Sequence, residues 1–429
     1  MRISTLQAFN NGVAGLQRNY ANATRTQEQI STGNRILTPA DDPVASVRLL
    51  QLEQQQNVLG QYNANLTAAK NSLTQEEVTL NSVNTVLQRV RELAVQAGNG
   101  ALSTEDRKSI AAELTEREDE LLSLMNTRNA RGEYLFSGFQ GKTQPFVRAG
   151  DGSYSYQGDE GQRKLQIASS LNIPISDNGK SIFQNITNAG RLQSSLSIGA
   201  ATDSTLKVSA PLVSDEVAFA GNPAFPPYGI DISFGSDGSY TIRALNQDGS
   251  VNPAEIGDGF MDTEASRSDT LVFRGMTMTL DGIPSGGESA TVIPKTVSGV
   301  DANGDPTVAA TNRQGILDTV ANLRFALESP ATGNGGVRDA VAVALTNLDH
   351  GMISVDAARG NIGARLNVIE TTQTDNEDVT LVNKSVQAEL RELDYAEALS
   401  RLSFQTVILE AAQQSYVKIS GLNLFNAMR

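Results

Sequence analysis

A strict seven-residue repeat runs through the first quarter of the chain. Its positions hold Leu52, Leu59, Leu66, Leu73, Leu80, Leu87 and Ala94. The intervening seam positions are also mostly apolar, and Gln55 and Glu76 are the polar exceptions. A period of seven keeps one face of a helix against a partner over many turns. The repeat therefore predicts a helix of roughly fifty residues, packed either in a bundle of the chain's own helices or in a dimeric coiled coil.

Breaks on both sides delimit this helix. Gly33 is suited to end a preceding helix in the left-handed region, and Asp42 followed by Pro43 is a good N-cap and first-turn pair for the next one. Residues 98–100 (Gly-Asn-Gly) end the long helix, and residues 103–106 (Ser-Thr-Glu-Asp) begin another. We therefore predict a helix before residue 33, the long helix, and a third helix that folds back on it.

The middle of the chain differs in composition from both ends. Residues from about 145 to 305 are rich in Gly, Asp, Ser, Thr and Pro. They contain hairpin signals, such as residues 146–148 and 154–156 around Gly150-Asp151-Gly152, strands flanking Asp237-Gly238, and residues 270–280. Helical periodicity returns after Thr311. The fold class is thus mainly α with a β insertion: a long helical bundle or coiled coil of N- and C-terminal segments, plus a central antiparallel β domain.

These boundaries predict three parts. Terminal assembly helices occupy 1–42 and 390–429, a helical core occupies 43–145 and 306–389, and a β-rich surface domain occupies 146–305.

Both chain ends carry weak amphipathic stripes. Ala, Tyr and Gln interrupt them where Leu or Ile would bind best. Ordering such ends costs about 1–2 kcal/mol per residue, so we expect residues 1–30 and 400–429 to be largely disordered in the free monomer and to fold on assembly. The predicted assembly residues are Leu6, Phe9, Val13, Leu16, Tyr20, Ile30, Leu402, Leu409, Tyr416, Ile419, Leu422, Leu424 and Phe425.

The composition argues against several classes of protein. A net charge of −14 provides no electrostatic footprint for a nucleic-acid backbone. Cysteine and tryptophan are absent, so there is no thiolate chemistry and little aromatic material for a ligand pocket. No apolar run approaches the ~20 residues of a membrane span, and the N-terminus lacks the apolar stretch of a secretory signal. We expect no enzyme activity, catalytic residue, cofactor, metal site, nucleic-acid binding or membrane contact.

Four features partly resemble functional motifs, but a structural interpretation is favoured for each. His350, the only histidine, is expected on a helix surface or hinge. Residues 301–305 begin like a calcium loop, but Pro306 replaces the required Gly, so a polar turn is expected. Asp41-Asp42 is interpreted as helix capping rather than a carboxylate pair. Residues 333–336 (Gly-Asn-Gly-Gly) lack the Lys-Ser/Thr of a phosphate loop and are expected to form an ordinary loop. An enzyme or ligand-binding module would instead need a convergent polar pocket in 145–305.

Several motifs resemble the flagellin superfamily. They lie at residues 29–36 (QISTGNRI), 40–42 (ADD), 87–96 (LQRVRELAVQ), 393–398 (LDYAEA) and 413–414 (QQ). Three further stretches favour the hook–filament junction branch over the filament protein. These are 36–43 (ILTPADDP), 132–138 (GEYLFSG) and 419–425 (ISGLNLF). The resemblance covers about 1–145 and 310–429, and the middle matches only weakly, at residues 275–282.

This resemblance implies a structural role in the bacterial flagellum. The chain would form a junction ring between the hook and the flagellin filament, or else be a filament subunit. The implied partners are further copies of itself, the hook-proximal hook-associated protein, flagellin, and an export chaperone that binds the C-terminal helix. The implied location is the extracellular flagellum, reached by type III export without a cleaved signal peptide. Arg89, Leu93 and Glu113 match positions that innate immune receptors contact in flagellins, although ordinary helix packing is the favoured interpretation.

Overall fold

The computed structural model describes residues 2–198, 204–262, 268–300, 306–329 and 333–427. Its contacts divide the chain into two compact units. The first comprises Met1–Thr67, Ile167–Ser170 and Ile369–Arg429, and the second comprises Ala68–Gln166 and Leu171–Val368. The division into terminal, core and surface domains made from the sequence remains a proposal.

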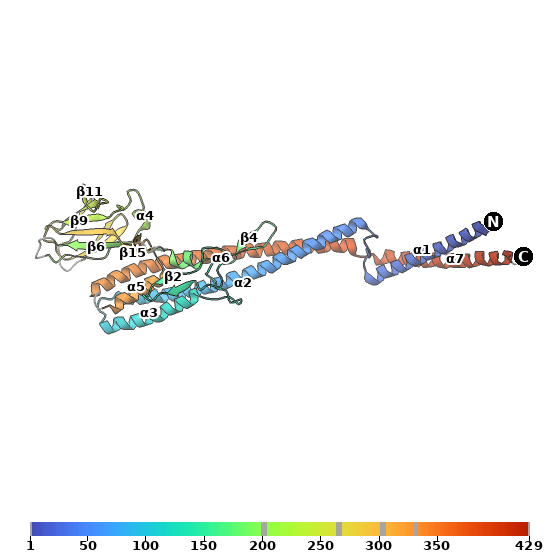
Figure 1. Cartoon of the computed structure of the whole chain (residues 1–429), viewed down its shortest axis with the longest axis horizontal. Helices are drawn as coiled ribbons and strands as arrows, with labels where there is room; N and C mark the ends of the chain where they lie inside the picture. The colour runs from blue at the N-terminus through green and yellow to red at the C-terminus, as the bar shows by residue number, and fades with distance from the viewer. Residues whose placement is uncertain (1, 199–203, 263–267, 301–305, 330–332, 428–429) are drawn as a thin grey trace. The chain divides into compact units, whose positions relative to one another are not determined.

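Helices form both ends of the chain, as predicted. In the described residues the α-helices are α1 (Arg2–Thr32), α2 (Pro43–Ala97), α3 (Thr104–Met125), α4 (Glu216–Phe219), α5 (Ile316–Glu328), α6 (Gly333–Arg391) and α7 (Tyr395–Ala427), with a short π-helix, η1, at Lys180–Gln184. Together with the central strands they confirm the predicted class, mainly α with an antiparallel β insertion (Figure 1).

The helix ends follow local chemistry. Gly33 has a φ of 71°, a left-handed conformation that ends α1. The Asp42 carboxylate accepts a hydrogen bond from the Ala45 N–H at 3.0 Å and caps α2. At α3, Ser103 and Asp106 form a reciprocal capping box. The breaks predicted at these positions are confirmed.

The leucine repeat is the buried seam of α2. Leu66, Leu73, Leu80 and Leu87 are fully buried within the single chain, as is the alanine that ends the repeat. In the second unit, α3, α5 and α6 lie beside α2 (Figure 1). Arg91 of α2 pairs with Asp349 of α6 at 2.8 Å. Of the two predicted arrangements, the bundle of the chain's own helices is therefore the observed one.

The described strands are short and antiparallel. They are β1 (Phe146–Arg148), β2 (Tyr154–Tyr156), β3 (Lys164–Gln166), β4 (Asn172–Pro174), β5 (Ile186–Thr187), β6 (Leu192–Ser197), β7 (Lys207–Val208), β8 (Leu212–Val213), β9 (Ile230–Phe234), β10 (Ser239–Leu245), β11 (Val251–Phe260), β12 (Ser268–Phe273), β13 (Met276–Asp281), β14 (Ser289–Pro294), β15 (Thr296–Val300), β16 (Pro306–Ala310) and β17 (Arg313–Gln314). The predicted hairpins are confirmed as β1–β2, β9–β10 and β12–β13.

Two larger sheets enclose the β core. One has the order β11-β10-β9-β14-β6, and in the other β13 pairs with β12, β7 and β8. Alternate residues of these strands point inward, as period-two patterning requires. Their buried side chains include Ile230, Ile232, Met276, Met278 and Val292, which belong to one apolar cluster.

One sequence prediction is wrong, and one proposed domain contains strands. Residues 306–310 and 313–314, which the sequence placed in the helical core domain, form strands β16 and β17, which pair with β15 and β5. Residues 333–336 were expected to form a loop, but α6 begins at Gly333. Glycine lowers helix propensity, but the first turn leaves its N–H groups free of intrahelical partners in any case. Packing of the buried residues Val337 and Val341 decides the outcome.

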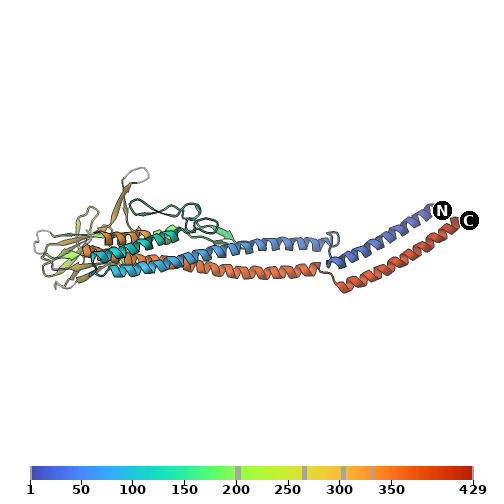
Figure 2. The same cartoon turned by 90° about the horizontal axis from the view of Figure 1, so that it is seen from below.

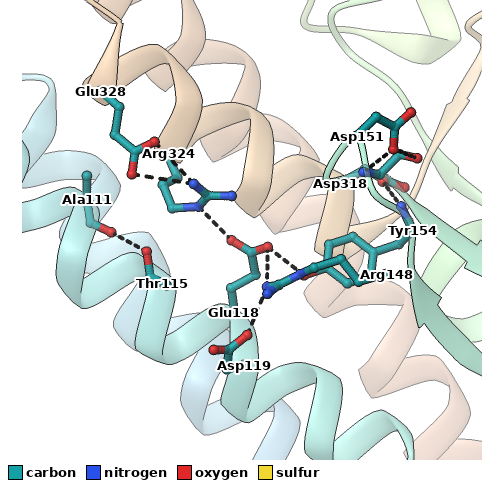
Figure 3. Close-up of polar contacts among 11 residues, drawn as sticks. Ala111, Thr115, Glu118, Asp119, Arg148, Asp151, Tyr154, Asp318, Arg324 and Glu328 are labelled. Carbon is teal, nitrogen blue, oxygen red and sulfur yellow. Dashed lines mark hydrogen bonds and ion pairs between the residues drawn. The ribbon is translucent and has the colours of Figure 1, made fainter.

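A buried carboxylate fastens the first β-hairpin to the helices. Glu118 of α3 is fully buried and accepts from Arg148 at 2.7 Å, Arg324 at 2.9 Å and the Tyr154 hydroxyl at 2.5 Å. Figure 3 shows the two arginines approaching Glu118 from different elements, the β1–β2 hairpin and α5. Burial and the Glu118 carboxylate raise the pKa of Tyr154, so its hydroxyl stays a donor. The 146–156 hairpin therefore contacts the helices, although it was predicted within the surface domain.

Candidate assembly surface

Within the first unit, the two terminal helices end at a shared joint. Arg35 donates its backbone N–H to the Arg391 carbonyl at 2.7 Å, and Leu393 donates to the Gly33 carbonyl at 3.0 Å. Asn34 and Glu392 form the antiparallel bridge between these bonds. The α1–α2 and α6–α7 breaks are thus hydrogen-bonded to each other, and each satisfies backbone groups that the other leaves open.

Side chains complete the joint. The buried amide of Gln29 donates to the Arg35 carbonyl at 2.6 Å. Asp41 accepts from the N–H groups of Leu37 and Thr38, both at 2.9 Å, and pairs with Arg25. Asp41 therefore organises the loop, whereas Asp42 caps α2, so the capping interpretation holds for Asp42 and not for Asp41.

Helices α1 and α7 pair along their length (Figure 2). The rings of Phe9 and Tyr416 lie 5.3 Å apart, and Gly12 makes room for the tyrosine, because a Cβ there would lie 3.3 Å from its ring. Leu402 and Leu409 of α7 are only half-buried, like Val13 and Leu16 of α1. This seam is narrow and incompletely covered.

The other predicted assembly residues have different positions. Tyr20 is 65% exposed, so it does not pack in the α1–α7 seam, and Ile30 is half-buried near the joint. Five further residues lie in α1 or α7, but their side chains fall outside the described part of the structure: Leu6, Ile419, Leu422, Leu424 and Phe425.

Exposed apolar side chains on α7 were missed by the sequence analysis. With 3.6 residues per turn, Phe404 and Val407 lie on the side of α7 opposite Leu409. They are 68% and 62% exposed, and Leu399 and Val417 are also exposed. A helix that is apolar on several sides is normally buried on several sides. These apolar residues are visible in the sequence, but the prediction considered only one stripe of the helix.

His350 and the trio Arg89, Leu93 and Glu113 pack against or pair with other parts of the chain. The His350 ring nitrogen Nδ1 lies 3.0 Å from the Thr187 carbonyl, which places it where α6 meets β5. Residues 301–305 lie outside the described residues. Leu93 is buried, and Arg89 pairs with Glu113 at 2.8 Å, which agrees with the packing interpretation of that trio.

The second unit also contains an open cavity. This cavity of about 450 Å³, lined by residues that include Asn188, Lys295, Arg313 and Asp318, lies where the β-rich segments meet α5. Within the described residues, no group of three or more His, Cys, Asp or Glu side chains is placed to hold a metal ion. The described helices include none with the length and apolarity to cross a membrane.

Known proteins resemble this chain over different lengths. The family model for the bacterial flagellin N-terminal helical region matches residues 3–141. Flagellar hook-associated protein 3 of Salmonella typhimurium is 36% identical over 187 residues, which is 44% of this chain. The chain spans only 58% of that relative's length. A flagellin of Clostridium tyrobutyricum is 24% identical over 94% of this chain and 95% of its own length.

A solved structure extends the similarity to the fold. The flagellar junction protein FlgL from Legionella pneumophila superposes with a TM-score of 0.60 and 26% identity. The match covers 80% of this chain and all of that one. The motifs, the family model and the shared fold agree: residues 3–141 form a bacterial flagellin N-terminal helical region, and the fold is that of the similar junction protein.

Proposed function

We propose that this chain is a structural subunit of the junction between flagellar hook and filament, and that it works by assembly rather than catalysis. The observation that carries the proposal is the incomplete burial of the apolar side chains of α7. One side of the helix packs on α1, while Phe404 and Val407 on the opposite side stay exposed. Burying such side chains between neighbouring copies would contribute roughly 1.5–3 kcal/mol for each one fully covered.

The similar proteins support this role over that of a generic helical protein. One relative bears the name flagellar hook-associated protein 3, and the similar solved structure is described as a flagellar junction protein. In this proposal the chain's partners are copies of itself in a ring, a hook-proximal hook-associated protein, and flagellin.

Gene deletion with electron microscopy tests the role directly. The expected phenotype is hooks without filaments, with flagellin lost to the medium. Normal filaments on the deletion strain would contradict the proposal. Complementation with the wild-type gene is the control.

Variants of α7 test the proposed mechanism. Phe404→Ser and Val407→Ser should abolish filament attachment while leaving the monomer's unfolding midpoint unchanged, because both side chains are exposed in the single chain. Gln413→Ala is the matched control, since it replaces an exposed polar residue of the same helix and should preserve attachment. Attached filaments are counted by electron microscopy. Normal attachment by both serine variants would remove the outer face of α7 from the mechanism.

Helix α7 also bears on how the chain is exported from the cell. An apolar α7 needs cover before assembly, which is the role we assign to an export chaperone on the C-terminal helix. We propose that the chain leaves the cell through the flagellar type III pathway with its N-terminus uncleaved. Pull-down of the intact chain and of Phe404→Ser from the cytoplasm compares chaperone capture directly.

The alternative role is a filament subunit, and the similarity to a flagellin over most of the chain supports it. The abundance of the protein in sheared flagella distinguishes the two roles. A junction subunit is a trace band in sheared flagella, whereas a filament subunit is the dominant one.

A further inference from the structure

One acidic residue interrupts the buried leucine seam of α2. Glu76 follows Leu73 and precedes Leu80, and only 1% of its surface is exposed. Its carboxyl oxygen Oε1 accepts a hydrogen bond from the Asp177 backbone N–H at 3.1 Å. A carboxyl group buried in this way must either find a cation or keep its proton.

The arginine nearest to Glu76 already binds another carboxylate. Both arms of Arg365, on α6, bind the Asp177 carboxylate, at 3.0 and 2.9 Å, and Gln162 donates to the same carboxylate at 2.6 Å. The other positive group that faces this site, Arg163, binds Glu133 at 2.7 Å. Two buried carboxyls therefore share one closely placed arginine, and the geometry gives that arginine to Asp177.

Glu76 consequently favours its neutral form. Burial, and after it the charge of Asp177, raises the pKa of Glu76 to about 8. Arg365 and Arg163 oppose this shift without cancelling it. At neutral pH the proton on Glu76 removes the repulsion between the two carboxyls.

The same contacts hold a segment of chain against α2. Asp177 is one end of it, and Ser72 of α2 donates to the Ile175 carbonyl at 3.1 Å. The side chains of Ile173 and Ile175 are buried. We propose that Glu76, Asp177 and Arg365 form a proton-dependent latch that closes residues 171–178 onto α2 and weakens when Glu76 loses its proton.

The direction of the pH effect follows from linkage. In the released segment Glu76 is hydrated and titrates near its ordinary value, whereas in the closed state it titrates near 8. The closed state therefore binds more protons between about pH 5 and 8, so closure weakens about tenfold per pH unit across that window and levels off above it.

The absence of cysteine allows a direct test in the full-length chain. Ile175→Cys places a single thiol at a buried position, and Asn172→Cys places one at an exposed position of the same segment. The ratio of their labelling rates cancels the common pH dependence of thiol reactivity. It should rise roughly fiftyfold from pH 6 to pH 8 and then level off.

Glu76→Gln is the decisive variant, because glutamine keeps the accepting oxygen and cannot ionise. In that background the ratio should stay constant with pH. Leu271→Cys, buried in the β core, reports global opening and should stay protected throughout. Amide exchange at Asp177, expressed as a protection factor, repeats the measurement without any new thiol. A constant ratio in the parent chain, or an equal rise in Glu76→Gln, would overturn the latch. The test uses the isolated chain and is independent of the proposed junction role.

Discussion

Single residues set the most sensitive points of this structure. Gly33 is one of them, because its φ is positive and the Tyr395 hydroxyl would lie 2.9 Å from any added Cβ. Glu118 is another, because one carboxylate serves two arginines and a tyrosine in a fully buried position. In both cases the local sequence allows several alternatives, and the surrounding contacts select one.

Gly33→Ala should loosen the joint. Forcing alanine into the left-handed region costs about 1–2 kcal/mol, and the contact with Tyr395 adds to that. Amide exchange at Arg35 and Leu393, which donate across the joint, should accelerate about tenfold. Gly60→Ala is the matched control: Gly60 is helical with open space around it, so this change should stabilise α2 by up to about 1 kcal/mol. Unchanged exchange at the joint would contradict the strain argument.

Glu118→Gln should destabilise the second unit strongly. It removes the charge that two arginines share, and breaking a buried pair in this way costs about 3–5 kcal/mol. Urea unfolding of the whole chain measures the loss. Asp119→Asn removes the neighbouring carboxylate, which also contacts Arg148 but is exposed, and should cost no more than about 1 kcal/mol. Equal losses for the two variants would mean that burial of Glu118 does not matter.

At the scale of elements, the long helices are specified by their period. The leucine seam of α2 was predictable because a repeat of seven acts locally and needs no knowledge of the fold. The strands β16 and β17 were not, since these short segments are held by pairing with β15 and β5. The glycine-rich start of α6 was missed for the same reason, because the packing that secures it is not local.

Leu73→Ala should test the seam. Leu73 is fully buried in α2, and truncation of such a side chain costs about 2–5 kcal/mol through lost contacts and a cavity. Val78→Ala, five residues along the same helix, changes an exposed side chain and should be neutral or slightly stabilising, since alanine is the better helix former. Thermal unfolding of both variants beside the parent chain measures the contrast. Similar losses at both positions would argue against a one-sided seam.

At the scale of the whole molecule, the chain ends differ from the interior. The α2 seam is closed by the chain's own helices, whereas α1 and α7 offer each other a half-buried seam and leave Phe404 and Val407 exposed. The entropy of ordering α1 (31 residues) and α7 (33 residues), roughly 1–2 kcal/mol per residue, is balanced only if further surface is buried. Assembly with neighbouring copies supplies that surface in the proposed function.

The free monomer should therefore exchange its terminal amides quickly. Protection in 1–30 and 400–429 is expected to be at least about a hundredfold below that of residues 66–94, in line with low local stability. Hydrogen exchange on the monomer measures this, and the same measurement on the assembled protein should show the protection restored. Strong protection throughout both ends of the monomer would overturn the idea that they fold on assembly.

The amino-acid sequence alone determined the kinds of element and their order, because helical and strand periods, caps and turn residues act over a few residues. Its motifs also identified the flagellin superfamily. The tertiary structure decided which surfaces remain open. It left the outer side of α7 uncovered and placed the 146–156 hairpin on Glu118. It also placed Glu76 beside Asp177, whose carboxylate already binds the nearby Arg365. Each of these depends on groups brought together from distant parts of the chain, and burial and charge then give them energies that no local pattern encodes.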